Sequence, residues 1–239
     1  MGGGTVYVLS PFKGGTWTET IAHNFAGGSD GCNPLSGVTL DETGNVYGTT
    51  YACGMQGGIT YGIVFKLSPS SGMWNETVLH AFTGGSDGGW PFGGVILDSS
   101  GNLYGSAYTG GNRSCAYSKG CGVIFRLSSH GKNWHESVIY NFSSLANANP
   151  SGPLIFDSAG NLYGTASDGA PGNSCCGTVF ELSPKQNGTW KETTLHSFQR
   201  ALDGAYPDGG LLLDAAGDLY GTAPYGGPAN EGVVFEIIP

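Results

Sequence analysis

The chain has 239 residues, of which 44 are Gly and 12 are Pro; 12% are aromatic and only 11% are charged. So much Gly excludes a mostly helical protein, and so many aromatic residues exclude a disordered chain. The net charge of −9 would repel a phosphate backbone, which excludes nucleic acid as a partner. No apolar run reaches the ~20 residues of a membrane helix, so we expect no membrane insertion. Residues 1–4 lack the charged and apolar segments of a signal peptide.

Read in chain order, the sequence predicts a strand at each short apolar or alternating run bounded by Gly, Pro, Asn or Ser. These runs fall into four types that recur in one order. The first full set is type a at 37–41, type b at 45–50, type c at 62–68 and type d at 74–82, preceded by type c at 4–10 and type d at 17–25. In later sets, type a ends at Asp98, Asp157 and Asp214, type b contains Gly105, Gly164 and Gly221, type c begins at Gly122, Gly177 and Gly232, and type d begins at Trp134 and Trp190.

Four antiparallel strands in each unit of about 57 residues predict an all-β fold, a β-propeller of four-stranded blades. We expect a single domain over 1–239, with repeat units at about 4–61, 62–121, 122–176 and 177–231 and a final strand at 232–239. Type c occurs five times and each other type four times, so one strand is extra. Either the terminal strands close the ring, or the extra strand exchanges with another chain, or the sequence belongs to a longer array.

Glycines in the repeat predict two local features. Asp41 and Gly44 predict a tight hairpin turn between types a and b, in which the carboxylate accepts hydrogen bonds from backbone amides and Gly44 has a positive φ. Gly48 lies inside type b, where the missing side chain would let a large ring from the neighbouring blade lie against the backbone.

Three segments carry a specific resemblance: Gly-Asn-Leu-Tyr-Gly-Thr at 160–165, Cys-Gly-Thr-Val-Phe-Glu-Leu-Ser-Pro at 176–184 and Trp-Lys-Glu-Thr-Thr-Leu-His-Ser-Phe at 190–198. They resemble the GloVer-type tandem repeats of bacterial secreted proteins, some described as choice-of-anchor proteins, over essentially the whole chain. The resemblance implies an extracellular, propeller-like repeat protein and supplies no catalytic residues. This chain is shorter than such proteins commonly are.

All six cysteines lie in the b-to-c and d-to-a loops, which are the long loops and share one face of a propeller. An even number of cysteines in such loops indicates disulfides formed in an oxidising compartment. A zinc site is the alternative, but the chain lacks paired C-x-x-C spacing and a nearby His. We predict pairing of Cys115 with Cys121 and of Cys32 with Cys53, which leaves Cys175 and Cys176 to bridge each other or to pair elsewhere.

Aromatic residues gather in the same loops, where they offer π faces on which the C–H faces of sugar rings stack. Trp90 is the strongest candidate, because Asn33, Asn149 and Tyr206 occupy the equivalent positions and the repeat does not itself require Trp. The simpler alternative is that these rings fill gaps between Gly-rich loops. The predicted ligand-binding residues are Trp90, Tyr51, Tyr108, Tyr206, Tyr225, Asp30, Asp87 and Asp203.

Two recurring motifs invite a chemical interpretation. Glu76 and His80 are four residues apart on type d, which suggests one strand face and an acid–base pair, but their recurrence in other units favours packing. The Asp-Gly-x-x-Pro motif at 30–34, 87–91 and 203–207 offers carboxylates to a cation such as calcium, but a turn-capping role is favoured. We therefore predict no catalytic residue, metal or cofactor.

The sequence favours an extracellular or cell-surface protein with a binding or assembly role rather than an enzymatic one. Carbohydrate or a surface polymer, recognised through the face of the long loops, is the expected partner. The first alternative is a hydrolase or lyase that acts on polysaccharide. The second is a structural subunit that forms a homo-oligomer or filament through unpaired edge strands. In the enzymatic case the candidate carboxylates are Asp30, Asp87, Asp203 and Glu231.

Overall fold

The computed structural model describes residues 3–54, 60–115, 119–131, 133–144, 148–168 and 176–238. Within these residues the protein is all-β, apart from the 3-10 turn η1 (Gly28–Asp30). The strands form five antiparallel sheets, which we call blades 1 to 5. Blade 1 contains β1 (Thr5–Pro11) and β2 (Trp17–Asn24); blade 2, β3 (Thr39–Leu40), β4 (Val46–Thr50), β5 (Ile63–Ser70) and β6 (Met73–Ala81); blade 3, β7 (Val95–Leu97), β8 (Leu103–Ala107), β9 (Val123–His130) and β10 (Asn133–Asn141); blade 4, β11 (Ala148–Pro150), β12 (Ile155–Phe156), β13 (Leu162–Asp168), β14 (Thr178–Pro184) and β15 (Trp190–Ser197); blade 5, β16 (Leu212–Leu213), β17 (Leu219–Ala223) and β18 (Val233–Ile237).

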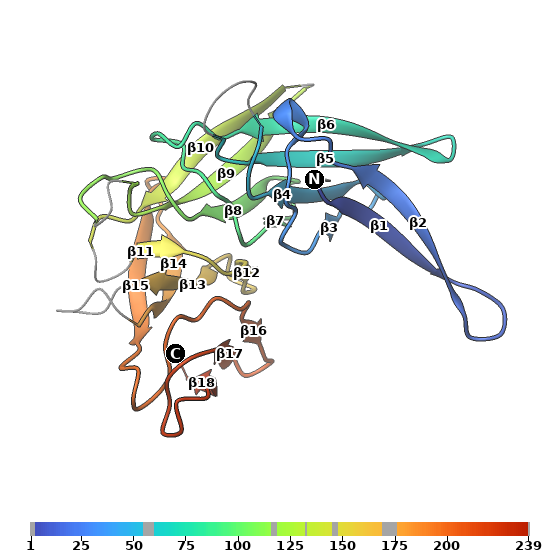
Figure 1. Ribbon diagram of the computed structural model, residues 1–239. Helices are drawn as coiled ribbons and strands as arrows, with labels where there is room; N and C mark the ends of the chain where they lie inside the picture. Colours follow the sequence, from blue (N-terminus) through green and yellow to red (C-terminus); the bar gives the residue numbers. More distant parts are fainter. Residues whose placement is uncertain are drawn as a thin grey trace.

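The arrangement is a β-propeller, which confirms the predicted fold class. Blades 2, 3 and 4 contain all four strand types, and in blade 4 both β11 and β12 pair with β13 at the inner edge. Blade 1 has only types c and d, and blade 5 has only types a, b and c. In Figure 1 the blades follow one another from β1–β2 in blue to β16–β18 in red. Blades 1 and 5 are separate sheets, so the terminal strands of this chain do not combine into one blade.

One hydrophobic layer lies between each pair of neighbouring blades. The type d Phe of one blade meets the type c Phe of the next, edge to face, with centroids 5.0–5.3 Å apart. Between blades 2 and 3, for example, Val64 and Phe82 pack against Phe125, and all three side chains are fully buried. Burying each such side chain contributes ~1.5–3 kcal/mol. Every blade therefore has two faces. The forward face is directed toward the next blade and carries residues such as Val64. The rear face is directed toward the preceding blade and carries residues such as Phe125.

The predicted hairpin turn is present. Asp41 Oδ1 accepts hydrogen bonds from the Thr43 and Asn45 amides, both at 2.9 Å, and Gly44 has φ 82°. Burial alone would raise the pKa of Asp41, but the hydrogen bonds from Asn45 and Thr43 lower it well below its ordinary value. The same turn recurs in blades 3, 4 and 5.

The explanation for the type b glycines needs a correction. A Cβ on Gly48 would lie 2.6 Å from Cζ of Phe65, which is its direct partner on β5. The ring therefore belongs to the adjacent strand of the same blade, not to the neighbouring blade.

The expectation that Glu76 and His80 share a strand face is wrong. Val64 pairs with His80 and Phe65 pairs with Val78, so Leu79 is an extra residue in a β-bulge. A bulge reverses which face the following residues occupy. His80 consequently lies on the forward face of β6, with Val64, whereas Glu76 lies on the rear face.

Candidate functional site

A cavity of about 930 Å³ lies on the inner side of blades 2 to 5, where their type a strands meet the long loops. Its wall is mostly apolar, with hydroxyl and carboxyl groups at a few points. Five of the predicted ligand-binding residues, all aromatic, are brought together in it; their ligand role stays a prediction. The lining residues are Leu35, Ser36, Gly37, Val38, Thr39, Tyr51, Trp90, Phe92, Gly93, Val95, Ile96, Tyr108, Ser151, Pro153, Ser167, Asp168, Tyr206, Asp208 and Tyr225.

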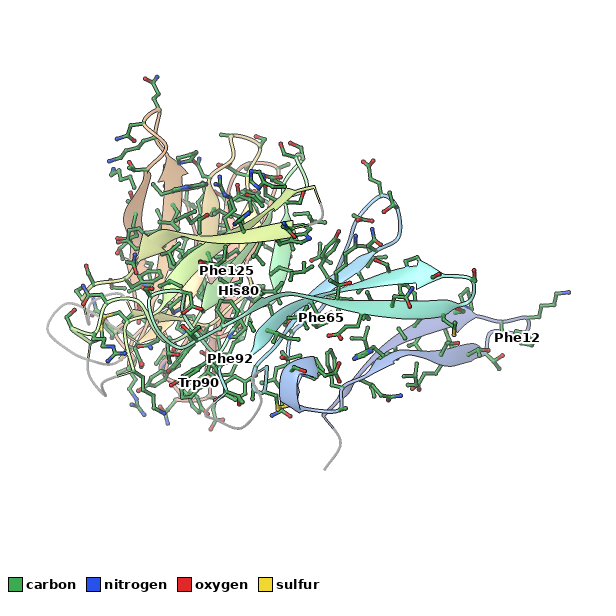
Figure 2. All side chains as sticks on the ribbon, turned by 90° about the horizontal axis from the view of Figure 1, so that it is seen from above. Phe12, Phe65, His80, Trp90, Phe92 and Phe125 are labelled. Carbon is green, nitrogen blue, oxygen red and sulfur yellow. A yellow bond between two sulfur atoms is a disulfide. The ribbon has the colours of Figure 1, made fainter. Side chains whose placement is uncertain are left out.

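The aromatic residues of this cavity form a connected series. Tyr51 lies between Trp90 and Phe92, with ring centroids 5.7 and 4.6 Å away, and Phe92 meets Tyr108 edge to face at 5.3 Å. Figure 2 shows Trp90 and Phe92 near one another, far from Phe12 at the tip of the β1–β2 hairpin. Tyr206 and Tyr225 form a second, edge-to-face pair at 5.9 Å. All of these rings except Tyr225, which is exposed, are half-buried.

Trp90 and Tyr206 have a backbone conformation that aromatic residues rarely adopt. Their φ angles are 56° and 58°, and the equivalent Asn33 and Asn149 have 58° and 60°. The repeat imposes this conformation, because the amide of each of these residues donates to the carbonyl of the residue just before a type c strand. The acceptors are Gly3, Tyr61, Cys121 and Cys176. Asn tolerates the left-handed region, whereas a bulky side chain is strained there by about 1–2 kcal/mol.

Local contacts hold the Trp90 ring in place. Its Nε1 donates to the Thr60 carbonyl at 3.3 Å, and Lys119 Nζ lies 4.2 Å from the ring centroid. Such a cation–π contact contributes ~0.5–1 kcal/mol at an exposed site. The indole is thus fixed before any ligand arrives, which lowers the entropy lost on binding.

Two carboxyl groups in the cavity, Asp168 and Asp208, were missed by the sequence reasoning. Partial burial raises the pKa of Asp168, and the Asp208 charge raises it further, although the Tyr108 hydroxyl, at 3.4 Å, acts in the opposite direction. Partial burial also raises the pKa of Asp208. Neither residue recurs in the repeat, since Ala52 and Thr109 are equivalent to Asp168, and Leu35, Phe92 and Ser151 to Asp208. That irregularity was the signal that could have revealed them.

The three predicted aspartates outside this cavity have local partners. His23 lies 2.9 Å from Asp30, His80 3.2 Å from Asp87 and His196 2.8 Å from Asp203. Each carboxylate also accepts a bond from the backbone amide four residues earlier, as a turn-capping residue does. Asp87 in addition lies at a second, more open hollow of about 660 Å³. Whether any of the three contacts a ligand stays a prediction.

Two of these His–Asp pairs, those of His23 and His80, face a glutamate of the next blade. Atoms of His23, Asp30 and Glu76 all lie within 4.8 Å of one another. Burial and the Asp30 carboxylate raise the pKa of Glu76 to about 7. We interpret the group as an interblade contact rather than a metal site, because Glu136 faces His80 and Asp87 in the same way at the next boundary.

The disulfides join Cys32 to Cys53 and Cys115 to Cys121, the pairs that the loop positions predict. Cys176 is also disulfide-bonded, whereas Cys175 lies outside the described residues. These bonds indicate an oxidising environment. Within the described part of the chain, no helix has the length and apolar character to cross a membrane.

The sheet topology and the recurring interblade contacts define a β-propeller repeat protein. Residues 114–239 match the Gloeobacter/Verrucomicrobia repeat, and the chain belongs to this repeat family. This confirms the resemblance seen in the sequence. No curated protein matches the chain.

Three solved structures are similar in fold. One is a putative gluconolactonase, with 18% identity, coverage of 85% of this chain and 63% of that chain, and a TM-score of 0.48. Another is a gluconolactonase from Xanthomonas campestris, with 15% identity, coverage of 85% and 62%, and a TM-score of 0.48. The third, of unknown function from Dyadobacter fermentans, has 14% identity, coverage of 77% and 60%, and a TM-score of 0.47. This chain spans less than two thirds of the length of each.

Proposed function

We propose that this protein binds carbohydrate, as a polysaccharide or surface polymer, in the aromatic cavity of blades 2 to 5. The observation that carries the proposal is the strained conformation of Trp90 and Tyr206. The fold accepts Asn at this position, as in two other units, so the repeat does not itself require an aromatic residue there, and the backbone strain is a cost to stability. Strain of this kind is found where function requires a particular side chain.

The chemistry of the cavity suits a sugar polymer. Aromatic faces stack on the C–H faces of pyranose rings, and the surrounding hydroxyl and carboxyl groups bind sugar hydroxyls. The series from Trp90 through Tyr51 and Phe92 to Tyr108 is continuous, which favours a ligand of several sugar units over a monosaccharide. Because the protein carries a net charge of −9 and the cavity contains two carboxyl groups, we expect a neutral polymer.

We further propose that the protein acts outside the cell or at its surface. Disulfides persist in such oxidising compartments, and the tandem repeats resemble those of secreted proteins. Immunoblots of cell fractions from the native host test this, with thiol alkylation before denaturation. Disulfide-bonded protein in the extracellular or surface fraction is expected, and thiol-reactive protein confined to the cytosol would contradict it.

The binding proposal is tested by calorimetric titration with a panel of soluble neutral polysaccharides. Trp90→Asn and Tyr206→Asn place in the cavity the residue that other units use. We expect each variant to weaken binding about five- to tenfold, as the loss of one stacking contact predicts. Phe12→Ala, which removes an exposed ring at the hairpin tip, is the matched control and should bind as the parent does. Equal affinity of all four proteins, or no binding by the parent, would refute the proposal.

A second candidate function, cleavage of the bound polysaccharide, is favoured by Asp168 and Asp208. Both pKa values are raised, and carboxyl groups of this kind serve as general acids in glycosidic bond cleavage. New reducing ends or unsaturated products, lost in Asp168→Asn, would establish catalysis. Binding without product release, unchanged over long incubation, would leave the protein as a binding module.

A further inference from the structure

Two histidines lie on one face of the hairpin formed by β9 and β10 in blade 3. His130 is the last residue of β9, and its partner on β10 is Asn133. His135 lies two residues after Asn133, and its partner is Ser128. Because side chains alternate along a strand and paired residues share a face, the two imidazoles are on the same side of the hairpin. They are diagonal neighbours, close enough for side chains of this size to meet.

The two imidazole rings are close together and accessible to solvent. Their centroids are 5.4 Å apart, and the rings meet edge to face. Both residues are exposed. The pairing of β9 with β10 continues as far as His130 and Asn133, so the backbone fixes the positions from which both side chains start. The strands therefore bring the two rings together before any ligand binds.

This pair differs from the other three histidines of the chain. His23, His80 and His196 each have an aspartate carboxylate 2.8–3.2 Å from Nε2. Among the residues that the structure describes, His130 and His135 have no hydrogen-bond or ion-pair partner, and their one recorded contact is with each other. Their ring nitrogens are therefore available to a ligand from solution.

The histidine pair is specific to blade 3. The hairpin of blade 2 has the same length, and Ser70 and Asn75 occupy the two equivalent positions. The hairpins of blades 1 and 4 are one residue longer, and the residue after their type d Trp is Thr18 or Lys191. The hairpin therefore does not require histidine at either position for its own folding.

We propose that His130 and His135 bind Zn²⁺, or a similar divalent transition metal ion, through one nitrogen of each imidazole. Imidazole is a preferred ligand of such ions. An ion about 2.0–2.1 Å from both nitrogens, in tetrahedral geometry, places the two ring centroids about 5 Å apart, close to the 5.4 Å of the structure. Rotation about χ2 of His is broad, so the nitrogens turn toward one ion without backbone movement. This differs from the sequence-based expectation of no metal.

The rest of the molecule favours a cation at this pair. The net charge of −9 attracts cations to the protein surface. Thiolates would compete for the ion, but every cysteine in the described ranges is disulfide-bonded. No third histidine, cysteine or carboxylate of the described residues joins the pair, so water or an outside ligand fills the remaining coordination positions. Neither histidine lines the aromatic cavity, so the site is separate from the proposed carbohydrate site.

Calorimetric titration with Zn²⁺ tests the site. We expect His130→Ser and His135→Asn, which introduce the residues of the blade 2 hairpin, each to weaken binding about tenfold or more, and the double variant to abolish it. The matched control is His196→Tyr, which introduces the residue that blade 3 has at that position of type d, and it should bind as the parent does. No binding by the parent, or undiminished binding by the double variant, would refute the proposal.

NMR spectra of the histidine rings identify the ligands directly. On addition of Zn²⁺, the ring signals of His130 and His135 should shift together and reach their end point at one ion per chain. The signals of the other three histidines should stay in place. Shifts confined to His23 would place the ion beside Asp30 and Glu76, the one group of three candidate ligands in the described residues, and would overturn the proposal. A shift of only one ring of the pair would overturn it as well.

Discussion

Replacing Glu76 with Gln tests the polar contact between blades 1 and 2. Glu76 faces His23 and Asp30, and in the folded protein its pKa is raised from 4.5 to about 7 by burial and by the Asp30 carboxylate. The folded state therefore binds the Glu76 proton more tightly than the unfolded state does. The resulting stabilisation is fully present below pH 4.5 and is lost as the pH rises through about 7. Glu76→Gln keeps a neutral hydrogen-bonding group at all pH values, so it should remove this loss.

The magnitude follows from the shift. At 1.36 kcal/mol per pKa unit, a rise in the pKa of Glu76 from 4.5 to about 7 corresponds to at most about 3 kcal/mol in the free energy of unfolding. Because Glu76 is only half-buried, solvent screening reduces this contribution to about 1–2 kcal/mol. Urea unfolding should show Glu76→Gln more stable than the parent by that amount at pH 8 and nearly equal at pH 4.5. Glu19→Gln, at the equivalent exposed position of β2, is the control. Parallel pH profiles for the parent and Glu76→Gln would refute the reasoning.

Three further outcomes concern stability and are measured by urea unfolding. Removing the Cys32–Cys53 disulfide, which spans 21 residues, in the variant Cys32→Ala/Cys53→Ala should cost about 3 kcal/mol; an unchanged midpoint would contradict this. Gly105→Ala should cost about 1–3 kcal/mol, because the added Cβ would lie 2.5 Å from Cζ of Phe125; an unchanged midpoint would contradict this. Asp98→Ala, which removes the acceptor of the a-to-b turn, should cost ~1 kcal/mol at pH 7 and less on acidification, since hydrogen bonds outweigh burial and lower the pKa of Asp98.

The repeat made the blade architecture predictable from sequence. Each strand type has a fixed landmark, and the landmarks have the same physical role in every unit, such as Asp41 in its turn. The bulge in type d was not predictable in this way. Glu76 and His80 are four residues apart, which in a regular strand means one face, and only the backbone pairing reveals Leu79 as the extra residue.

The candidate site was predictable only where it departs from the repeat. Trp90 stands out in the sequence because other units have Asn, and the structure adds the reason why the change is costly, namely a positive φ. Asp168 and Asp208 depart from the repeat as well. Their significance emerges only when the fold brings these two residues, 40 positions apart in the sequence, to one cavity wall, where the charge of Asp208 raises the pKa of Asp168.

Residues that recur in successive units and residues such as Trp90 that depart from the repeat thus have different roles: the first lie at the contacts between blades, and the second lie in the cavity. A group that recurs at successive boundaries, such as the glutamate of type d, serves interblade packing, because each boundary has the same geometry. A residue that appears in only some units, at a position where it strains the backbone, contributes nothing that the other boundaries need. Trp90 and Glu76 should therefore differ in which property a substitution changes. Trp90→Asn, which introduces the residue suited to the positive φ, weakens ligand binding. Glu76→Gln, which keeps an uncharged side chain, changes stability and leaves binding intact.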